Sequence, residues 1–133
     1  MTYEISSSIL PDGDELKQLF TQTTWASYRT DQDINRMLLS LKTFVTIRVD
    51  QKLIGFGRAI TDGIYRALID DIIVDSAYRN KGLGREIMQQ LIDQLVDVEE
   101  VFLNTKPDME AFYEQFGFKL FSGITMKKIA KNL

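Results

Sequence analysis

The sequence of 133 residues contains no cysteine and no histidine. Without cysteine the chain has no disulfide, no thiolate metal ligand and no cysteine nucleophile. Without histidine it has no Ser-His-Asp triad, no imidazole base and no His-ligated zinc. We therefore expect no metal, and any acid-base chemistry must use carboxylates, tyrosine, lysine or water.

Long apolar runs are also missing, and there are only two prolines. No segment is apolar for the length that a membrane span requires. The first residues, MTYEISSSILPDGDE, carry early acids and do not resemble a secretory signal. These features predict a cytoplasmic protein that is not bound to a membrane. The net charge of -3 argues against nucleic acid as the main partner.

The length and the apolar fraction of 44% predict one compact domain, residues 1–133. Hydrophobic periodicity predicts helices over residues 11–20, 31–41, 83–96 and 107–117. Alternating or apolar runs predict strands over residues 3–6, 43–49, 53–60, 64–74 and 101–105, and a last hairpin that joins residues 118–121 to 124–127. The order predicts an α+β fold with a mostly antiparallel sheet and one strand-turn-helix crossover.

The most informative segment is the turn RNKGLG between a predicted strand and a predicted helix. Gly82 and Gly84 leave the first amides of the helix open, and these amides and the helix dipole favour an anion. Arg79, Lys81 and Arg85 add positive charge. A tight connection is the plainer explanation of two glycines. The turn lacks the GK[ST] ending of a Walker loop and the third glycine of the dinucleotide fingerprint, so another phosphate-bearing ligand is predicted.

Two motifs carry a family resemblance. Residues 79–84, RNKGLG, are similar to the R/Q-x-x-G-x-G/A signature of the GNAT superfamily of N-acetyltransferases, and the apolar strand DDIIV precedes them. Residues 112–118, FYEQFGF, resemble the family's late FYEKxGF segment. The resemblance covers the chain from about Thr43 onward. It implies a mixed, mostly antiparallel sheet that is splayed at its centre, with acetyl-CoA as acyl donor and direct attack by an amine on the thioester.

The resemblance also implies a set of cofactor-binding residues. The glycine turn would hold the pyrophosphate of acetyl-CoA through Arg79, Lys81, Gly82, Leu83, Gly84 and Arg85. The pantetheine arm would pair with the backbone of Ile72, Ile73 and Val74, whose side chains are expected in the core. Phe112 begins the second motif. Many members have an asparagine at the position of Lys106, whereas here the candidate Asn104 lies nearby but out of register.

Three residues are catalytic candidates. The resemblance implies that Tyr113 gives a proton to the departing thiolate, and packing is its alternative role. Asp70 or Asp71 would receive or orient the amine, and a purely structural carboxylate is the alternative for each. Strict strand alternation predicts that these two acids point to opposite faces, so that only one enters the cleft.

The acceptor side is less defined. Trp25, Tyr28 and Arg29 lie between the two early helices, where the family usually builds its acceptor pocket, although core packing is an alternative for Trp25. Arg58 and Tyr65 either line the same cleft or are exposed strand residues. The predicted function is N-acetylation of a primary amine of a small molecule. A peptide or protein N-acetyltransferase and a non-catalytic CoA-binding module are the alternatives, and a homodimer is one possible assembly.

Overall fold

The computed structural model describes residues 2–131. Met1, Asn132 and Leu133, which end the predicted domain, lie outside the described residues. The strands are β1 (Glu4–Ser6), β2 (Thr43–Val49), β3 (Lys52–Thr61), β4 (Arg66–Val74) and β5 (Glu100–Phe102). The helices are α1 (Gly13–Phe20), α2 (Asp31–Ser40), α3 (Leu83–Gln94) and α4 (Glu110–Glu114), with the 3-10 turns η1 (Ser76–Tyr78) and η2 (Pro107–Met109).

The strands form one sheet in the order β1-β2-β3-β4-β5, which confirms the α+β fold. β1 to β4 are antiparallel neighbours, and β5 runs parallel to β4. β4 pairs with β5 only from Arg66 to Leu68 and continues to Val74 without a partner on that side. The sheet is therefore splayed between β4 and β5, as the family resemblance implies.

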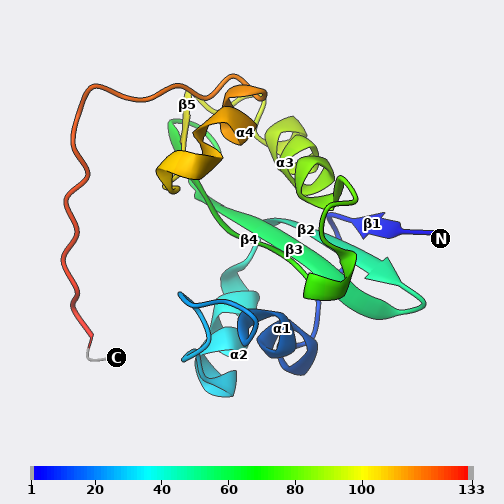
Figure 1. The fold of residues 1–133 in the computed structure, drawn as a ribbon. Coiled ribbons are helices and arrows are strands. Elements are labelled where there is room, and N and C mark those ends of the chain that lie inside the picture. Colours follow the sequence, from blue (N-terminus) through cyan, green and yellow to red (C-terminus); the bar gives the residue numbers. More distant parts are fainter. Residues whose placement is uncertain (1, 132–133) are drawn as a thin grey trace.

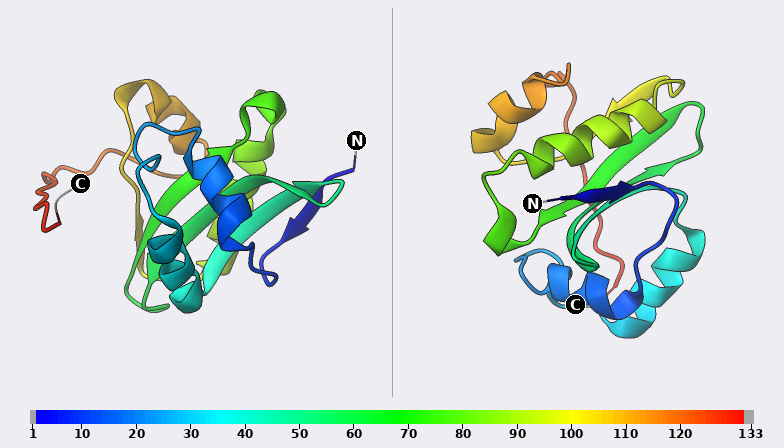
Figure 2. Two further views of the ribbon diagram at one scale, coloured as in Figure 1. Left: turned by 90° about the horizontal axis from the view of Figure 1, so that it is seen from below. Right: turned by 90° about the vertical axis from the view of Figure 1, so that its right-hand side faces the viewer.

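Helices cover both faces of the sheet (Figures 1 and 2). On one face α3 contributes Ile87, Met88 and Leu91 to a core that includes Val45 and Ile54 of the sheet. On the other face α1 and α2 pack against Phe44, Phe56 and Ile73, with Phe20 and Phe56 edge to face at 6.3 Å. Two cores explain why β3 is buried over most of its length rather than alternating.

Local signals set where the helices begin. Asp12 caps α1 by accepting from the Glu15 amide at 2.9 Å, while the Glu15 side chain accepts from the Asp12 amide. Thr30 caps α2 through the Asp33 amide at 3.2 Å. Within residues 2–131, no helix is long and apolar enough to cross a bilayer.

The predicted hairpin at the C-terminus is wrong. Residues 118–131 form an extended tail that contains no strand, and the strand predicted over residues 101–105 ends at Phe102. The tail leaves α4 and runs outside the body toward α2, where the Lys131 ammonium lies 2.8 Å from an Asp33 carboxylate oxygen (Figure 1). The alternation in this segment is real, but strand formation also needs a pairing partner, and sequence alternation does not supply one.

Candidate active site

The glycine turn forms an open helix start. Gly82 has φ 81° and ψ 9°, a left-handed conformation that side chains rarely adopt, and α3 begins immediately after it. No side chain caps this start. A Cβ added at Gly84 would meet only the Phe112 ring, at 3.9 Å. The first amides of α3 are thus accessible to an anion and lie at the positive end of the helix dipole.

The three basic residues near the turn have different environments. The Arg79 Nε donates to the Val74 carbonyl at 3.1 Å, while Lys81 is exposed. The Arg85 guanidinium hydrogen-bonds to the Gln115 side chain and lies 5.6 Å from the centre of the Phe116 ring. Arg85 therefore joins α3 to the segment after α4, and Lys81 has the greatest freedom to meet a phosphate.

The free edge of β4 leads directly to this turn. Ile72, Ile73 and Val74 lie beyond the last residue that pairs with β5. Ile73 is buried against α1 and α2, and Ile72 and Val74 pack against the α3 core. Their side chains are core residues, as predicted. The Asp75 amide donates to the Ile54 carbonyl of β3, so alternation turns the backbone groups of Ile72 and Val74 toward the splay and those of Ile73 toward β3. An extended ligand can pair with such an edge and end at the amides of α3.

Both candidate acids lie on one face of the sheet, which corrects the prediction of opposite faces. Asp71 has φ 57° and forms a bulge, because β3 offers only Gly57 between the pairs Phe56–Ile73 and Arg58–Asp70. The extra residue interrupts the alternation. The Arg58 guanidinium reaches both acids, with Nη2 at 3.7 Å from Asp70 Oδ2 and Nε at 2.7 Å from Asp71 Oδ2.

Asp71 is a buried ion-paired carboxylate. Its side chain is fully buried, and its Oδ2 also accepts from Arg29 Nη1 at 2.8 Å. Burial raises the pKa of Asp71, but the hydrogen bonds from Arg29 and Arg58 outweigh it and the pKa is lowered. Asp71 Oδ1 is buried with no partner among the described residues. A carboxylate held charged in this way is a poor proton acceptor.

Asp70 has the opposite character. Its side chain is 41% exposed, and one of its oxygens accepts from the Asp71 amide at 2.9 Å. Burial and the negative charge of Asp71 raise the pKa of Asp70, although Arg58 and Arg29 oppose this shift. An accessible carboxylate with a raised pKa is suited to accept or orient a proton at a pH nearer neutrality.

Tyr113 lies on α4 among aromatic rings. Its ring is edge to face with Phe112 at 5.0 Å and with Phe118 at 6.3 Å. Burial raises the pKa of the Tyr113 phenol, and the Thr105 side chain partly offsets this shift. Because the neighbouring Phe112 lies over Gly84, α4 brings Tyr113 to the same side of the splay as the start of α3.

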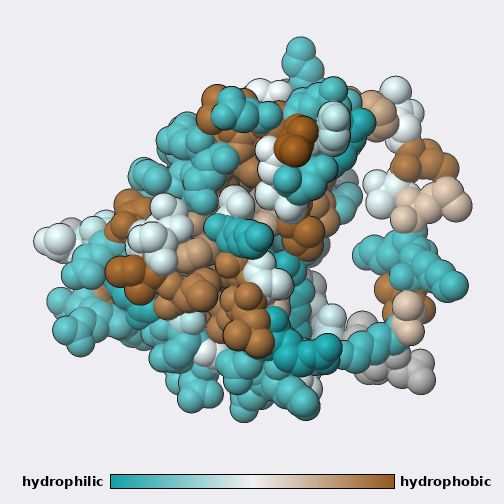
Figure 3. Space-filling model, turned by 180° about the vertical axis from the view of Figure 1, so that it is seen from behind, coloured by the Kyte–Doolittle hydropathy of each residue, from teal (hydrophilic) through white to brown (hydrophobic). Residues whose placement is uncertain are grey.

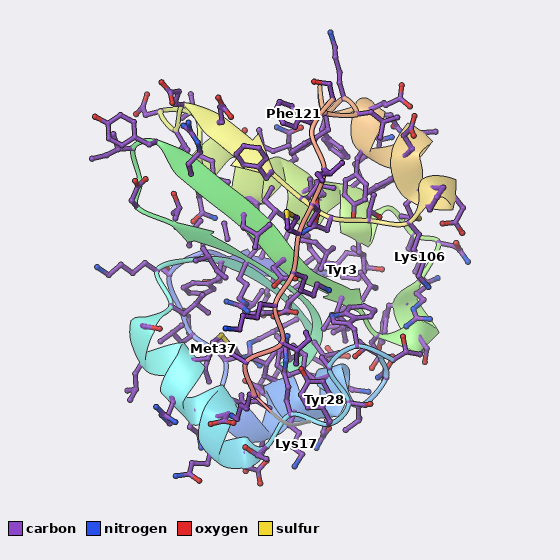
Figure 4. The ribbon with its side chains drawn as sticks, turned by 90° about the vertical axis from the view of Figure 1, so that its left-hand side faces the viewer. Tyr3, Lys17, Tyr28, Met37, Lys106 and Phe121 are labelled. Carbon is purple, nitrogen blue, oxygen red and sulfur yellow. The ribbon has the colours of Figure 1, made fainter. Side chains whose placement is uncertain are left out.

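The predicted acceptor residues belong to the segment between α1 and α2. Trp25 and Tyr28 are 50% and 53% exposed, so core packing does not explain Trp25. Figure 4 shows Tyr28 on this segment. Arg29 turns inward to Asp71 and lies 4.8 Å from the centre of the Phe20 ring. Tyr65 is exposed at the β3–β4 turn, and Asn104 and Lys106 are exposed after β5.

Several contacts that support the site were not predicted from the sequence. Gln22, after α1, donates to Asp75 Oδ2 at 3.1 Å and accepts from the Ser76 amide at 2.9 Å. Asp75 also caps η1 through the Ala77 amide at 2.9 Å. An Asp that follows a strand is a recognisable cap signal, but the Gln22 partner and the Thr105 neighbour of Tyr113 have no local signal. Across the described chain, no group of three or more Asp or Glu is placed to hold a metal ion.

A comparison with protein-family models matches residues 10–118 to the acetyltransferase (GNAT) family. The chain belongs to this family. It is 31% identical over 113 residues to the uncharacterized N-acetyltransferase ycf52 of Porphyra purpurea, which covers 78% of this chain and 63% of that protein. It is 34% identical over 71 residues to the histone acetyltransferase TAP1 of Glycine max, which covers 52% of this chain and 31% of that protein. The chain thus spans less than two thirds of these relatives.

Among GNAT structures, the glucosamine-6-phosphate N-acetyltransferase of Arabidopsis thaliana superposes with a TM-score of 0.77 at 23% identity. The superposition covers 98% of this chain and all of that chain. At this identity the likeness establishes the fold. The family resemblance found in RNKGLG and FYEQFGF is confirmed by the family match.

Proposed function

We propose that this chain transfers an acetyl group from acetyl-CoA to a primary amine of a small molecule. The observation that carries the proposal is the continuity between the free edge of β4, residues 69–74, and the uncapped start of α3 at Gly82. The edge offers backbone pairing to an extended arm, and the helix start offers amides to phosphate. These are the two recognition elements that the pantetheine and pyrophosphate parts of acetyl-CoA require.

Acetyl-CoA supplies an activated thioester. The amine nitrogen forms a bond to the thioester carbonyl carbon, the bond from carbon to sulfur breaks, and the sulfur leaves with its electron pair. One proton leaves nitrogen and one reaches sulfur. The acetyl group passes directly to nitrogen, so no covalent bond to the protein forms. We assign the acceptance of the proton from nitrogen to Asp70, because its side chain is accessible and its pKa is raised. We assign the donation of a proton to sulfur to Tyr113, because α4 carries it beside the start of α3.

In this proposal Asp71 is a positioning residue rather than a base. It holds Arg29 and Arg58 in the face of the sheet that carries Asp70. Arg58 in turn lies 3.7 Å from the Asp70 carboxylate, and its positive charge limits the rise in the pKa of Asp70. Trp25 and Tyr28 are exposed next to Arg29 and are the proposed wall for the acceptor.

A small amine is preferred to a peptide because the charged cluster is compact. Arg29 and Arg58 balance the charges of Asp70 and Asp71, so the cluster has no excess of negative charge that would attract a basic peptide. Asp70, the half-exposed acid, is left to accept a hydrogen bond from one amine group. Small amines and histones both occur as acceptors in the names of similar proteins, so the acceptor class needs a direct test.

The test is a competition between acceptor classes. Purified protein is given acetyl-CoA and, in turn, amino sugars, polyamines, aminoglycosides and lysine-containing peptides, and CoA release is followed with a thiol reagent. The chain has no cysteine, so the thiol signal comes from CoA alone. We expect the highest kcat/KM with a small amine. A peptide that exceeds every small amine would replace this acceptor class, and tight acetyl-CoA binding without turnover would favour a CoA-binding module.

The cytoplasmic location stays part of the proposal. Fractionation of cells that express the natural gene product would test it, with recovery in an organelle as the contrary result.

A further inference from the structure

The loop between α1 and α2, residues 21–30, is tied to β4 at two places. Near its start Gln22 hydrogen-bonds to Asp75, the residue that directly follows β4. Near its end Arg29 Nη1 donates to Asp71 Oδ2 at 2.8 Å. Asp71 and Asp75 flank the free edge of β4 described above. The loop is therefore fastened at both ends of the edge that we assign to acetyl-CoA.

The contact of Gln22 uses both atoms of its amide group. Nε2 donates to Asp75 Oδ2 at 3.1 Å, and Oε1 accepts from the Ser76 amide at 2.9 Å. Because a carboxylate accepts and a backbone amide donates, these two partners fit an amide side chain in one orientation. The Asp75 amide also donates to the Ile54 carbonyl at 2.7 Å, and Asp75 Oδ1 accepts from the Ala77 amide at 2.9 Å. Gln22 thus docks the loop on a corner whose other hydrogen bonds do not involve the loop.

The anchored loop carries two exposed aromatic side chains. Trp25 and Tyr28 are 50% and 53% exposed, whereas Ala26 between them is fully buried and its amide donates to Thr23 Oγ1 at 2.9 Å. The tail, residues 118–131, stands away from the body over most of its length and does not cover the two rings (Figure 3). Because half of each aromatic residue is exposed, its position depends mainly on the course of the loop backbone.

The loop is long enough to take other courses. From Gln22 to Arg29 an extended chain spans up to about 24 Å. The strand from Asp71 to Asp75 spans at most about 13 Å. The loop therefore has slack, and its two side-chain anchors and the buried Ala26 select the observed course. Loss of the Gln22 anchor would free the first half of the loop, while Arg29 would keep the second half in place.

We propose that Gln22 is a positioning residue for the acceptor amine. By docking the loop on the corner at Asp75, it places Trp25 and Tyr28 at a fixed distance from acetyl-CoA that lies along the free edge of β4. The inference rests on the acetyl transfer proposed above, because it needs a cosubstrate on that edge. Within residues 2–131, the side-chain hydrogen bonds of Gln22 reach none of the groups assigned to proton transfer. Gln22 therefore acts on acceptor binding and not on the chemical step.

The first experiment is steady-state kinetics of Gln22→Ala with an amine that the wild type acetylates. Loss of two hydrogen bonds, one of them to a carboxylate, should raise the KM for the amine by about tenfold, with kcat and the Kd for acetyl-CoA kept within about twofold. Gln22→Glu still accepts from the Ser76 amide but sets two carboxylates together, so its KM should rise at least as far. Gln18→Ala is the matched control, because it removes the same side chain from an exposed position of α1.

The melting temperature separates positioning from a general loss of structure. It should stay close to that of the wild type, because Gln22 is exposed and Asp75 keeps the Ala77 amide and Lys52, whose Nζ lies 3.9 Å from Asp75 Oδ2. An unchanged KM for the amine in an active Gln22→Ala protein would overturn the proposal. Equal increases in KM for both substrates, together with a lower melting temperature, would overturn it as well.

The second experiment tests the placement of the loop without turnover. Trp25 is the single tryptophan of the chain, so its fluorescence reports on this loop alone. The acrylamide quenching constant of Trp25 should rise in Gln22→Ala and Gln22→Glu and stay at the wild-type value in Gln18→Ala. Equal constants in the wild type and Gln22→Ala would overturn the placement, whether or not an amine is acetylated. A wild type that acetylates no amine would overturn the acetyl transfer, and with it the acceptor role, but not the placement.

Discussion

At the residue scale, Asp70 and Asp71 show how neighbours in sequence acquire different chemistry. The bulge at Asp71 brings both carboxylates to Arg58, but Arg29 reaches only Asp71 at hydrogen-bond distance. The pKa of Asp71 is lowered as a result, while that of Asp70 is raised by burial and by the charge of Asp71. A left-handed non-glycine residue costs roughly 1–3 kcal/mol, and such strain concentrates at functional sites.

Replacing Asp70 with Asn should lower kcat by roughly 10²-fold or more, because the proton acceptor is lost. Acetyl-CoA affinity should be nearly unchanged, since the phosphates are assigned to the start of α3. In the wild type, kcat/KM should fall as the pH drops through the pKa of Asp70, which lies above the ordinary aspartate value. This limb should vanish in the variant.

Steady-state kinetics over a pH series would make the measurement, with Asp50→Asn as the matched control. Asp50 is exposed in the β2–β3 turn at φ 49°, a conformation that Asn tolerates, so its replacement should leave the acidic limb of the pH profile in place. If the acidic limb is unchanged in the Asp70 variant, the group that titrates is the amine of the substrate, and Asp70 has no role in the mechanism.

Removing only the phenol oxygen of Tyr113 tests whether this residue protonates the leaving sulfur. Tyr113→Phe keeps the ring that packs on Phe112 and Phe118, so the melting temperature should change little. If the phenol protonates the leaving sulfur, kcat should fall by roughly 10²- to 10⁴-fold with acetyl-CoA affinity kept.

Tyr3→Phe is the control for loss of a hydroxyl, because Tyr3 is a partly buried residue at the other end of the chain. Kinetics and melting curves on both variants separate the two roles. Normal turnover in Tyr113→Phe would return this residue to packing alone.

At the element scale, the start of α3 is the main recognition device. Gly84→Val should weaken acetyl-CoA binding by at least about tenfold, equivalent to about 1.4 kcal/mol, because a branched side chain would crowd the helix amides. The protein should still fold, since a Cβ at Gly84 meets only the Phe112 ring in ordinary contact.

Titration calorimetry would measure this affinity. Gln89→Val places the same side chain at an exposed position of the same helix and serves as the control. Wild-type affinity in a folded Gly84→Val protein would exclude the turn as the phosphate site.

Most helices and strands were predictable from the sequence, but the contacts between them were not. Gly82 and the capping residues Asp12 and Thr30 act on their own neighbours, so local reasoning found the helix starts. Arg85 was assigned to the phosphate turn, whereas its partner Gln115 lies thirty positions later and carries no signal in the sequence. The predicted terminal hairpin failed for the same reason, since alternation gives a strand its faces and not its neighbour.

At the scale of the whole molecule, Asp71 joins three parts of the fold. It lies on β4 and binds Arg58 of β3 and Arg29 of the segment between α1 and α2. Asp71→Asn should reduce the free energy of unfolding by roughly 3 kcal/mol at neutral pH, because it leaves two partly buried arginines with an uncharged partner. Denaturant titration would measure the difference from wild type.

The pH dependence of this difference has a defined sign. The pKa of Asp71 is lowered in the folded state, so its stabilisation is present above the unfolded value of about 3.9 and is lost as the pH falls through the folded-state pKa. The gap between wild type and variant should therefore shrink in acid. A gap that is equal at neutral and acidic pH would mean that the charge of Asp71 contributes little.

The family and the sheet order were accessible from two motifs, yet the bulge was not, because strict alternation is the default for a strand. The bulge determines the arrangement of the site, because it places both acids on the face of the sheet that carries Arg58 and the early helices. Because the free edge of β4 lies beside the uncapped start of α3, we propose that acetyl transfer takes place at this junction.

The most direct test of that claim is the initial rate of thiol release from acetyl-CoA, measured with and without an acceptor amine. The absence of cysteine in the chain makes free CoA the source of the signal. We expect release that depends on the amine, saturates with acetyl-CoA and falls sharply in Gly84→Val at subsaturating acetyl-CoA. Acetyl-CoA that binds to the protein but is not consumed with any amine class would contradict it.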